Sequence, residues 1–220
     1  MNSIQMTTST YIDGIEIHLN SLKFIFIPKI KTLLCADLHI GKAAHFRNHG
    51  VPIPVLANQN NFWNLSTALD LYKPNQLIVL GDLFHSTENI EWNDFTDFLD
   101  NYPKLQRVLV RGNHEVYFDS TYQAMHFDVH DVLQIDNFIL SHEPLAEIPK
   151  GFYNLCGHMH PAVRLVGHAR QSIRLPCFWF SKNMGVLPAC GEFTGMHTVR
   201  PKSGDRLFVV AGNKLIEKLA

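Results

Sequence analysis

The sequence has few of the features that mark specialised classes of protein. Its four cysteines form no CxxC pair, so they fit reduced thiols packed in a core better than a disulfide framework. Its apolar runs, such as Phe24–Ile27, fall far short of the roughly 20 residues that a membrane span needs. With 19 basic and 20 acidic residues the net charge is -1, so nucleic acid could bind only through a local basic patch.

The sequence also shows no targeting signal and no linker segment. Met1–Thr10 carries neither a basic nor an apolar segment, so we expect no signal peptide and a cytoplasmic protein. Hydrophobic residues make up 46% and charged residues 18%, which is typical of globular chains and not of disordered ones. Because no repeat, low-complexity tract or linker interrupts the sequence, we expect residues 1–220 to form a single domain.

The first half of the chain alternates strand-like with helix-like segments. A hairpin is predicted from Ile15–His18 and Phe24–Ile27, with Asn20-Ser21 at its turn. The continuous apolar runs, typical of strands buried on both faces, are Thr32–Ala36, Leu77–Leu80 and Val108–Val110. The predicted helices are Lys42–Asn48, Ala57–Tyr72 and Trp92–Asn101. This order indicates a mostly parallel sheet with helices outside it.

After residue 125 the pattern changes to short strands and tight turns. The predicted strands are Val132–Ile135, Phe138–Leu140, Tyr153–Cys156, Ser172–Leu175, Leu207–Val210 and Lys214–Ile216. Asp136-Asn137 and Gly212-Asn213 are typical of hairpin turns. A second, more antiparallel sheet packed against the first is therefore expected, which makes the fold an α/β sandwich.

The chain contains 13 histidines, and several of them fall in short motifs that follow strand-like runs. The motifs are Ala36-Asp37-Leu38-His39, Gly81-Asp82, Gly112-Asn113-His114-Glu115, Ser141-His142-Glu143-Pro144 and Gly157-His158-Met159-His160. Ligands in open α/β sheets collect outside the carboxyl ends of strands, so we expect these motifs to meet along one rim. Asp-x-His, Gly-Asp or His142 alone would be ordinary turn or structural chemistry, and Gly112-Asn113-His114-Glu115 is the more specific motif. Their combination in this order leaves little room for chance.

The residues expected at that rim offer oxygen and nitrogen donors of borderline hardness. They are Asp37, His39, Asp82, Asn113, His142, His158 and His160. Such a set suits Mn²⁺, Fe or Zn²⁺ and is large enough for two ions that share a bridging carboxylate. His114 directly follows the amide donor, so it could stay off the metal and protonate a leaving oxygen or stabilise phosphoryl charge. The hypothesis is a phosphodiesterase in which a metal-bridging hydroxide attacks phosphorus.

This ordered set of motifs, spanning residues 36–161, resembles the calcineurin-like metallophosphoesterase superfamily. The resemblance implies a four-layer α/β sandwich with two mixed β-sheets flanked by helices, and two metal ions. By position it assigns one metal site to Asp37, His39, Asp82 and His160. It assigns the other to Asp82, Asn113, His142 and His158, with Asp82 bridging and His114 as the catalytic histidine. Many members carry an acid where this chain has His85, which leaves Glu115 or a backbone carbonyl to orient His114.

A narrower resemblance rests on longer segments. Ala36–Lys42, Gly81–Ser86 and Leu187–Gly195 are similar to the bacterial ligase-associated metallophosphoesterases, a DNA damage response endonuclease family. This implies cleavage of phosphodiester bonds in DNA during repair, with Mn²⁺ as cofactor and a functional association with a DNA ligase and a helicase. The alternative is a small-molecule nucleotide phosphatase, cyclic-nucleotide phosphodiesterase or pyrophosphatase of the same fold. A scaffold without catalysis ranks last, because no ligand of the set is missing.

The remaining candidates have simpler interpretations beside functional ones. Lys42 and Arg47 could meet substrate phosphate or form a solvated helix face. The aromatic run Phe178–Phe180 could stack an unpaired base but is more typical of a core strand. The histidines outside the motifs are interpreted mostly as surface residues, with His85 and His197 as the exceptions to watch. They are His18, His45, His49, His85, His126, His130, His168 and His197.

Overall fold

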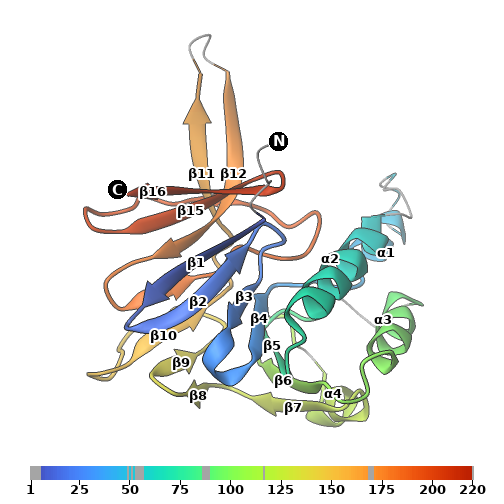
Figure 1. Ribbon diagram of the computed structural model, residues 1–220. Helices are drawn as coiled ribbons and strands as arrows, with labels where there is room; N and C mark the ends of the chain where they lie inside the picture. Colours follow the sequence, from blue (N-terminus) through green and yellow to red (C-terminus); the bar gives the residue numbers. More distant parts are fainter. Residues whose placement is uncertain are drawn as a thin grey trace.

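The structure of the protein is a computed structural model that describes residues 6–48, 50, 52, 57–85, 90–115, 117–167 and 171–219. Two β-sheets lie one against the other, and the α-helices gather on one side of the molecule (Figure 1). No helix of the described ranges is long and apolar enough to cross a membrane.

The first sheet has seven strands whose order in space is their order in the sequence. They are β1 (Thr7–Ile12), β2 (Ile15–Asn20), β3 (Ile25–Ile27), β4 (Thr32–Ala36), β5 (Gln76–Leu80), β6 (Gln106–Val110) and β7 (Phe127–His130). The strands β1 to β4 pair antiparallel, and β4 to β7 pair parallel. The parallel strands therefore all end at the same edge of the sheet.

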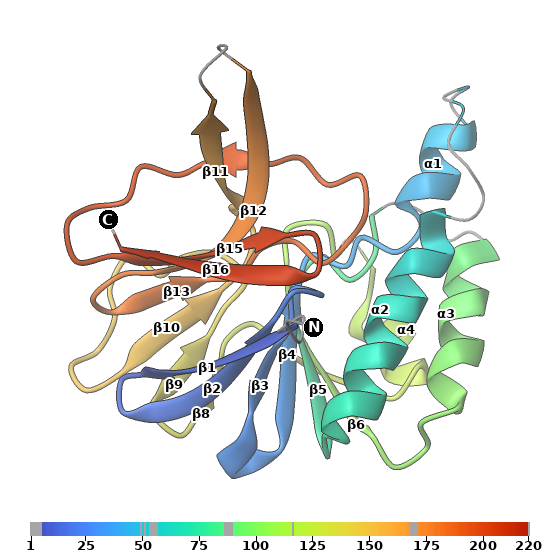
Figure 2. The same cartoon turned by 45° about the horizontal axis from the view of Figure 1, so that its top comes forward.

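Helices provide the connections between the parallel strands and cover the outer face of this sheet (Figure 2). They are α1 (Lys42–Asn48), α2 (Ala57–Tyr72), α3 (Ile90–Asp100) and α4 (Asp119–Ala124). A short 3₁₀ helix, η1 (Pro28–Ile30), instead joins β3 to β4. Alternation along β5 explains the layering: Leu77 and Val79 pack in the cluster under the helices, whereas Ile78 and Leu80 pack between the sheets. A strand buried on both faces needs such a continuous apolar run.

The second sheet is built almost entirely after α4. Its strands are β8 (Leu133–Ile135), β9 (Phe138–Leu140), β10 (Tyr153–Cys156), β11 (Pro161–Val166), β12 (Ser172–Phe180), β13 (Met184–Val186), β14 (His197–Thr198), β15 (Arg206–Ala211) and β16 (Lys214–Leu219). The pairs β9/β10, β10/β13 and β11/β14 are parallel and the others antiparallel. Phe138, Leu155 and Phe208 belong to the core cluster between the two sheets.

The predicted α/β class with two mixed sheets is confirmed. The resemblance implies helices on both sheets; in the described ranges all helices precede β7 and form one layer, on the first sheet. Among the described residues after β7, the chain forms strands joined by turns and longer loops, without a helix. The four cysteines are buried and free, and burial raises the pKa of Cys177 to about 12, as expected of packed thiols.

Most predicted elements are present, but several strands differ. Sequence analysis missed β1, α4, β7, β11, β13 and β14. The predicted strand at Ser172–Leu175 continues to Phe180, so the aromatic run lies inside β12. Phe178 and Phe180 are buried in the core and Trp179 donates its Nε1–H to Asp205, so the core interpretation of this run is the right one.

Candidate metal centre

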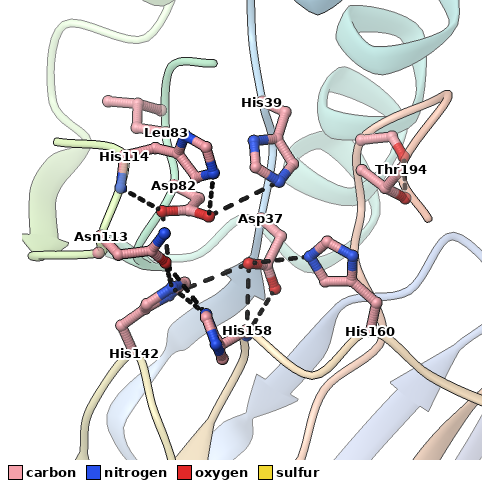
Figure 3. Close-up of polar contacts among 12 residues, drawn as sticks. Asp37, His39, Asp82, Leu83, Asn113, His114, His142, His158, His160 and Thr194 are labelled. Carbon is pink, nitrogen blue, oxygen red and sulfur yellow. Dashed lines mark hydrogen bonds and ion pairs between the residues drawn. The ribbon is translucent and has the colours of Figure 1, made fainter. Parts of the chain in front are cut away.

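The structure brings together all the predicted ligand side chains at the edge where the parallel strands end (Figure 3). Asp37 and His39 follow β4, Asp82 follows β5, Asn113 follows β6, His142 follows β9, and His158 and His160 follow β10. Contact between the two sheets is direct, because the backbone N–H of His158 donates to Asp37 Oδ2 at 3.0 Å. The candidate site therefore lies where the edges of both sheets meet.

One group of donors surrounds the buried carboxylate of Asp37. His160 Nε2 lies 3.3 Å from Asp37 Oδ1. The donor atoms of Asp37, His39 and His160 all lie within 4.8 Å of one another. Three donors at this separation fit around a single divalent ion.

A second group of donors surrounds His142. Its Nε2 lies 2.9 Å from Asn113 Oδ1 and 3.5 Å from Asp82 Oδ1. His158 Nδ1 lies 3.0 Å from both Asn113 Oδ1 and His142 Nε2. Two imidazole nitrogens and the Asn113 oxygen thus lie close to one another, with Asp82 Oδ1 near the His142 nitrogen.

Asp82 lies between the two groups. Its Oδ2 is 3.7 Å from His39 Nε2, and its Oδ1 is 3.5 Å from His142 Nε2. Asp37 also contacts both groups, since its Oδ1 lies 3.9 Å from His142 Nδ1 as well as near His160. Either carboxylate is placed to face two ions, and Asp82 presents a different oxygen to each group.

Hydrogen bonding leaves the donor nitrogens available. His142 Nδ1 donates to the Leu80 carbonyl at 3.0 Å and His160 Nδ1 to the Gly195 carbonyl at 3.1 Å, so Nε2 of each ring is the nitrogen that can offer a lone pair to a metal ion. Both ring nitrogens of His39 and Nε2 of His160 are buried without a hydrogen-bond partner among the described residues. Buried polar atoms are normally satisfied, so these nitrogens fit metal ligands.

The protonation state of His39 agrees with that role. Burial, followed by the charges of Lys42 and neighbouring histidines, lowers the pKa of His39 to about 2. The imidazole is therefore neutral at physiological pH. Only the neutral ring can bind a metal ion.

The backbone at the ligand positions adopts a conformation that L-residues rarely use. Five of the candidate ligands have a positive φ: Asp37 (54°), His39 (47°), Asp82 (50°), His158 (64°) and His160 (46°). Each such residue costs roughly 1–3 kcal/mol and persists only where the surrounding structure holds it. The clustering of these conformations at one edge indicates that the strand ends are bent to aim these side chains inward.

Two motif glycines allow the close approach of the ligands. A Cβ on Gly81 would lie 2.1 Å from His142 Nδ1, and a Cβ on Gly157 would lie 2.7 Å from Asp37 Oδ2. No side chain fits at either position without moving a ligand. The glycines of the Gly-Asp and Gly-His motifs are therefore part of the site.

His114 stands beside the ligand group on its solvent side. Its Nε2 lies 3.9 Å from Asp82 Oδ2, and its side chain is 41% exposed. Its backbone N–H donates to Asp82 Oδ1 at 3.0 Å, which fixes the start of this loop relative to Asp82. The ring can thus reach a group bound at the cluster from outside.

Of the two candidates for orienting His114, Glu115 or a backbone carbonyl, Glu115 has other partners among the described residues. The buried Glu115 carboxylate accepts backbone hydrogen bonds from Asp82 (2.9 Å), Leu83 (2.6 Å) and Gly112 (2.6 Å). Burial and then the charge of Asp82 raise its pKa to about 6, against the effect of these hydrogen bonds. Glu115 therefore ties the loop after β5 to the loop after β6.

Sequence analysis undervalued a group of side chains next to His39 and His114. The His85 ring centroid lies 5.3 Å from that of His39, 5.5 Å from that of His114 and 5.4 Å from that of His45. Lys42 is close enough that the charges of Asp82 and Asp37 act on its pKa, which burial lowers. The signal for His85 was its spacing from Asp82, whereas nothing in the sequence marked His45.

The other candidates have structural or surface positions. Arg47 Nη2 donates to the buried Glu91 at 2.7 Å, so it joins α1 to α3. His197 is exposed, and its backbone N–H donates to the His160 carbonyl at 3.0 Å. His18 and His130 pair with neighbouring surface carboxylates. His49, His168 and Ser86 lie outside the described residues.

The segment Leu187–Gly195, singled out by its sequence, runs directly along the site. The backbone N–H groups of Cys190 and Gly191 donate to the carbonyls of Ala36 and Asp37, both at 2.9 Å. Its last residue supplies the carbonyl that holds His160. This segment therefore fixes the backbone at one ligand and the imidazole ring of another.

Cavities open on both sides of the donor cluster. One, of about 280 Å³, has His160, Phe193 and Met196 in its wall. The other, of about 400 Å³, is lined in part by Asn113 and His142. An extended substrate could therefore cross the cluster from one cavity to the other.

Comparisons with known proteins agree with this geometry. The family model "Calcineurin-like phosphoesterase" matches residues 30–213. The nuclease MPE of Pseudomonas putida is similar in structure, with 30% identity over 93% of this chain and 96% of that one and a TM-score of 0.79. Yfce, a phosphoesterase from E. coli, matches over 86% of this chain and 98% of its own with 14% identity and a TM-score of 0.46. No curated protein matches the sequence. The fold, the donor cluster and the match over residues 30–213 together show that the chain belongs to the calcineurin-like phosphoesterase family of metal-dependent hydrolases.

Proposed function

We propose that this protein is a two-metal phosphodiesterase that cleaves DNA. The observation that carries the proposal is the placement of Asp82, whose two oxygens face two different groups of donors. One site would use Asp37, His39, Asp82 and His160, and the other Asp82, Asn113, His142 and His158. Similarity to a nuclease over nearly the whole chain supports a polynucleotide as substrate.

The donor chemistry supports Mn²⁺ as the cation, with Fe or Zn²⁺ as alternatives, because imidazole and carboxylate are mixed. Two such ions, when bound, supply Lewis-acid stabilisation of the phosphoryl oxygens and a water of lowered pKa. The chain itself keeps the His39 imidazole neutral through burial, and the carbonyls of Leu80 and Gly195 hold the orientation of the His142 and His160 rings.

His114 has the position required of the residue that assists the leaving group. It touches Asp82 on one side and is open to solvent on the other. From there its ring can donate a proton to the departing oxygen, or a hydrogen bond to the phosphoryl group as charge builds up. Lys42 adds a positive charge close to Asp37 and Asp82, where a phosphate would also gain from it.

The protein is also proposed to act in a particular cellular process, with particular partner enzymes. The resemblance to ligase-associated metallophosphoesterases supports a cytoplasmic role in DNA repair, in functional association with a DNA ligase and a helicase. Co-purification of those two enzymes with the tagged protein from cells with damaged DNA would test this part.

The reaction is tested with purified protein and added Mn²⁺. We expect hydrolysis of a chromogenic phosphodiester to exceed that of the matching monoester, cleavage of DNA that weakens as salt rises, and loss of both activities in His114→Ala. Hydrolysis of nucleotides or pyrophosphates without cleavage of DNA would favour the small-molecule alternative. Absence of any Mn²⁺-dependent diesterase activity would overturn the proposal.

A further inference from the structure

A two-stranded arm rises from the second sheet beside the candidate site. It consists of β11 and β12, which pair antiparallel from Ala162 and Pro176 outward to Val166 and Ser172. Figures 1 and 2 both show this hairpin projecting beyond the rest of the sheet. The first residue of β11 directly follows His160, so the base of the arm lies at a candidate metal ligand.

Two arginines face each other across the arm. Arg164 and Arg174 are directly opposite in the strand register, and both are exposed. Like charges placed opposite each other in a sheet are destabilising. Within the described residues neither guanidinium forms an ion pair; Arg164 donates to Ser172 Oγ at 3.1 Å and Arg174 to the Met196 carbonyl at 3.2 Å. The pair is therefore a concentrated positive charge that an anion would stabilise.

The arginine pair is continuous with the cavity beside His160. Arg174 lies two residues before Pro176 and so on the same face of β12, and Pro176 lines that cavity. Met196 lines it too and accepts the hydrogen bond of Arg174. Phe193, 46% exposed, forms another part of the wall. One path thus leads from His160 past an aromatic ring to two unneutralised cations.

The cavity on the opposite side of the cluster has no comparable charge. Its arginine, Arg111, pairs with Asp119 and donates to Asp131 at 3.1 Å. Since the whole chain has a net charge of -1, the arm supplies the local basic surface that a polyanion needs.

We propose that the β11–β12 arm is the DNA-docking surface of this enzyme, and that Arg164 and Arg174 bind two backbone phosphates of the strand that leaves the metal centre across the His160 cavity. This inference rests on the proposed function, because it assumes that the scissile phosphate lies at the donor cluster. Phosphate contacts position a strand without reading its sequence. The arm would therefore favour long DNA substrates over small diesters, whatever the base sequence of the DNA.

The test compares Arg164→Gln/Arg174→Gln with Lys214→Gln/Lys218→Gln, which removes two charges from exposed positions of β16. The readouts are the ratio of DNA cleavage to hydrolysis of bis(4-nitrophenyl) phosphate in Mn²⁺, and the affinity for single-stranded DNA across a salt series. The small diester has a single phosphate, which the proposed function places at the metal centre, so it offers no second phosphate to the arginine pair. A general folding defect lowers both rates and leaves their ratio unchanged.

For the arm variant we expect the ratio to fall about tenfold, and the slope of log DNA affinity against log salt to become shallower by about 1.4, the value for two lost single-strand phosphate contacts. The β16 variant should match the wild type. An unchanged ratio and slope in the arm variant, or an equal fall in the β16 variant, would overturn the inference while leaving the proposed function intact. A wild-type enzyme that hydrolyses the small diester but never DNA would overturn both.

Discussion

The donor cluster has a buried half and an exposed half. The buried half consists of Asp37, His39, Asp82 and His142. The exposed half consists of Asn113 and His158, with the partly exposed His114 beside them, and His160 is intermediate in burial. The buried residues follow β4, β5 and β9, whose ends lie inside the junction of the two sheets. The exposed residues occupy the loops after β6 and β10. The packed sheets therefore fix the buried candidate ligands, whereas the loops at the rim hold the remaining candidate ligands and His114, which is open to solvent.

The largest effect is expected from the centre of the buried half. Asp82→Asn keeps the shape of the side chain but removes the charge that both donor groups face, so Mn²⁺ binding should fail and diesterase activity should fall more than about 100-fold. Metal content by mass spectrometry and the rate with the chromogenic diester measure this. The control is Asp94→Asn, an exposed position on α3. Full metal occupancy in Asp82→Asn would contradict the assignment.

A residue of the exposed half should affect chemistry without affecting the metal. For His114→Ala we expect kcat to fall about 10²–10³-fold with the metal content retained, since His114 acts on the substrate and not as a ligand. His130→Ala, a surface histidine paired with Asp128, is the control. Loss of metal from His114→Ala would show that His114 is a metal ligand, which would contradict its assignment as a residue that acts on the substrate.

Packing around the buried half can be tested through a glycine. Gly81→Ala adds a Cβ 2.1 Å from His142 Nδ1 at φ 75°, so we expect the free energy of unfolding to fall by about 1–3 kcal/mol or more, with weakened metal binding. Gly151 has a similar φ of 87° and nothing within 4 Å of the added Cβ. Gly151→Ala therefore measures only the loss of stability caused by a side chain at positive φ. Equal loss of stability in both variants would show that crowding of His142 is not the cause.

The smallest effect concerns pH. Burial, then the charge of Lys42, lowers the pKa of His85 to about 4 from its ordinary value of 6.5. The unfolded chain therefore binds a proton between these values that the folded metal-free chain does not, and stability falls as pH drops through this window. His85→Asn should make this dependence shallower by up to one proton in urea unfolding of metal-free protein between pH 4 and 6.5. An unchanged slope would contradict the placement of His85.

Much of the site could be predicted because its ligands follow continuous apolar runs. Strands such as β4 and β5 are buried on both faces, so their sequences are distinct and their ends mark the rim. By contrast, the edge strand β1 is rich in threonine and partly exposed, and β13 has only three residues, too few for any periodicity. Sequence analysis therefore missed β1 because of its composition and β13 because of its length.

The partners of site residues could not be predicted in the same way. Glu115 accepts hydrogen bonds from the backbone N–H groups of Asp82 and Leu83. Nearly every residue type has such a group, so no pattern of side chains in the sequence predicts this contact. The crowding of His85 against His39 and His114 depends on how the loops fold over one another. Residue identity gave the donors, whereas the hydrogen bonds that orient them required the three-dimensional structure.

The long sequence separation between Asp37 and Gly191, which share a backbone hydrogen bond, has a consequence for biosynthesis. A nascent chain that has emerged only through the first sheet exposes the aspartate and histidine after β4 without the late segment that secures them. Maturation of the centre must therefore wait for nearly complete translation. Chains arrested on the ribosome before Leu187 should gain no protease resistance from Mn²⁺, and those arrested well beyond Gly195 should gain it.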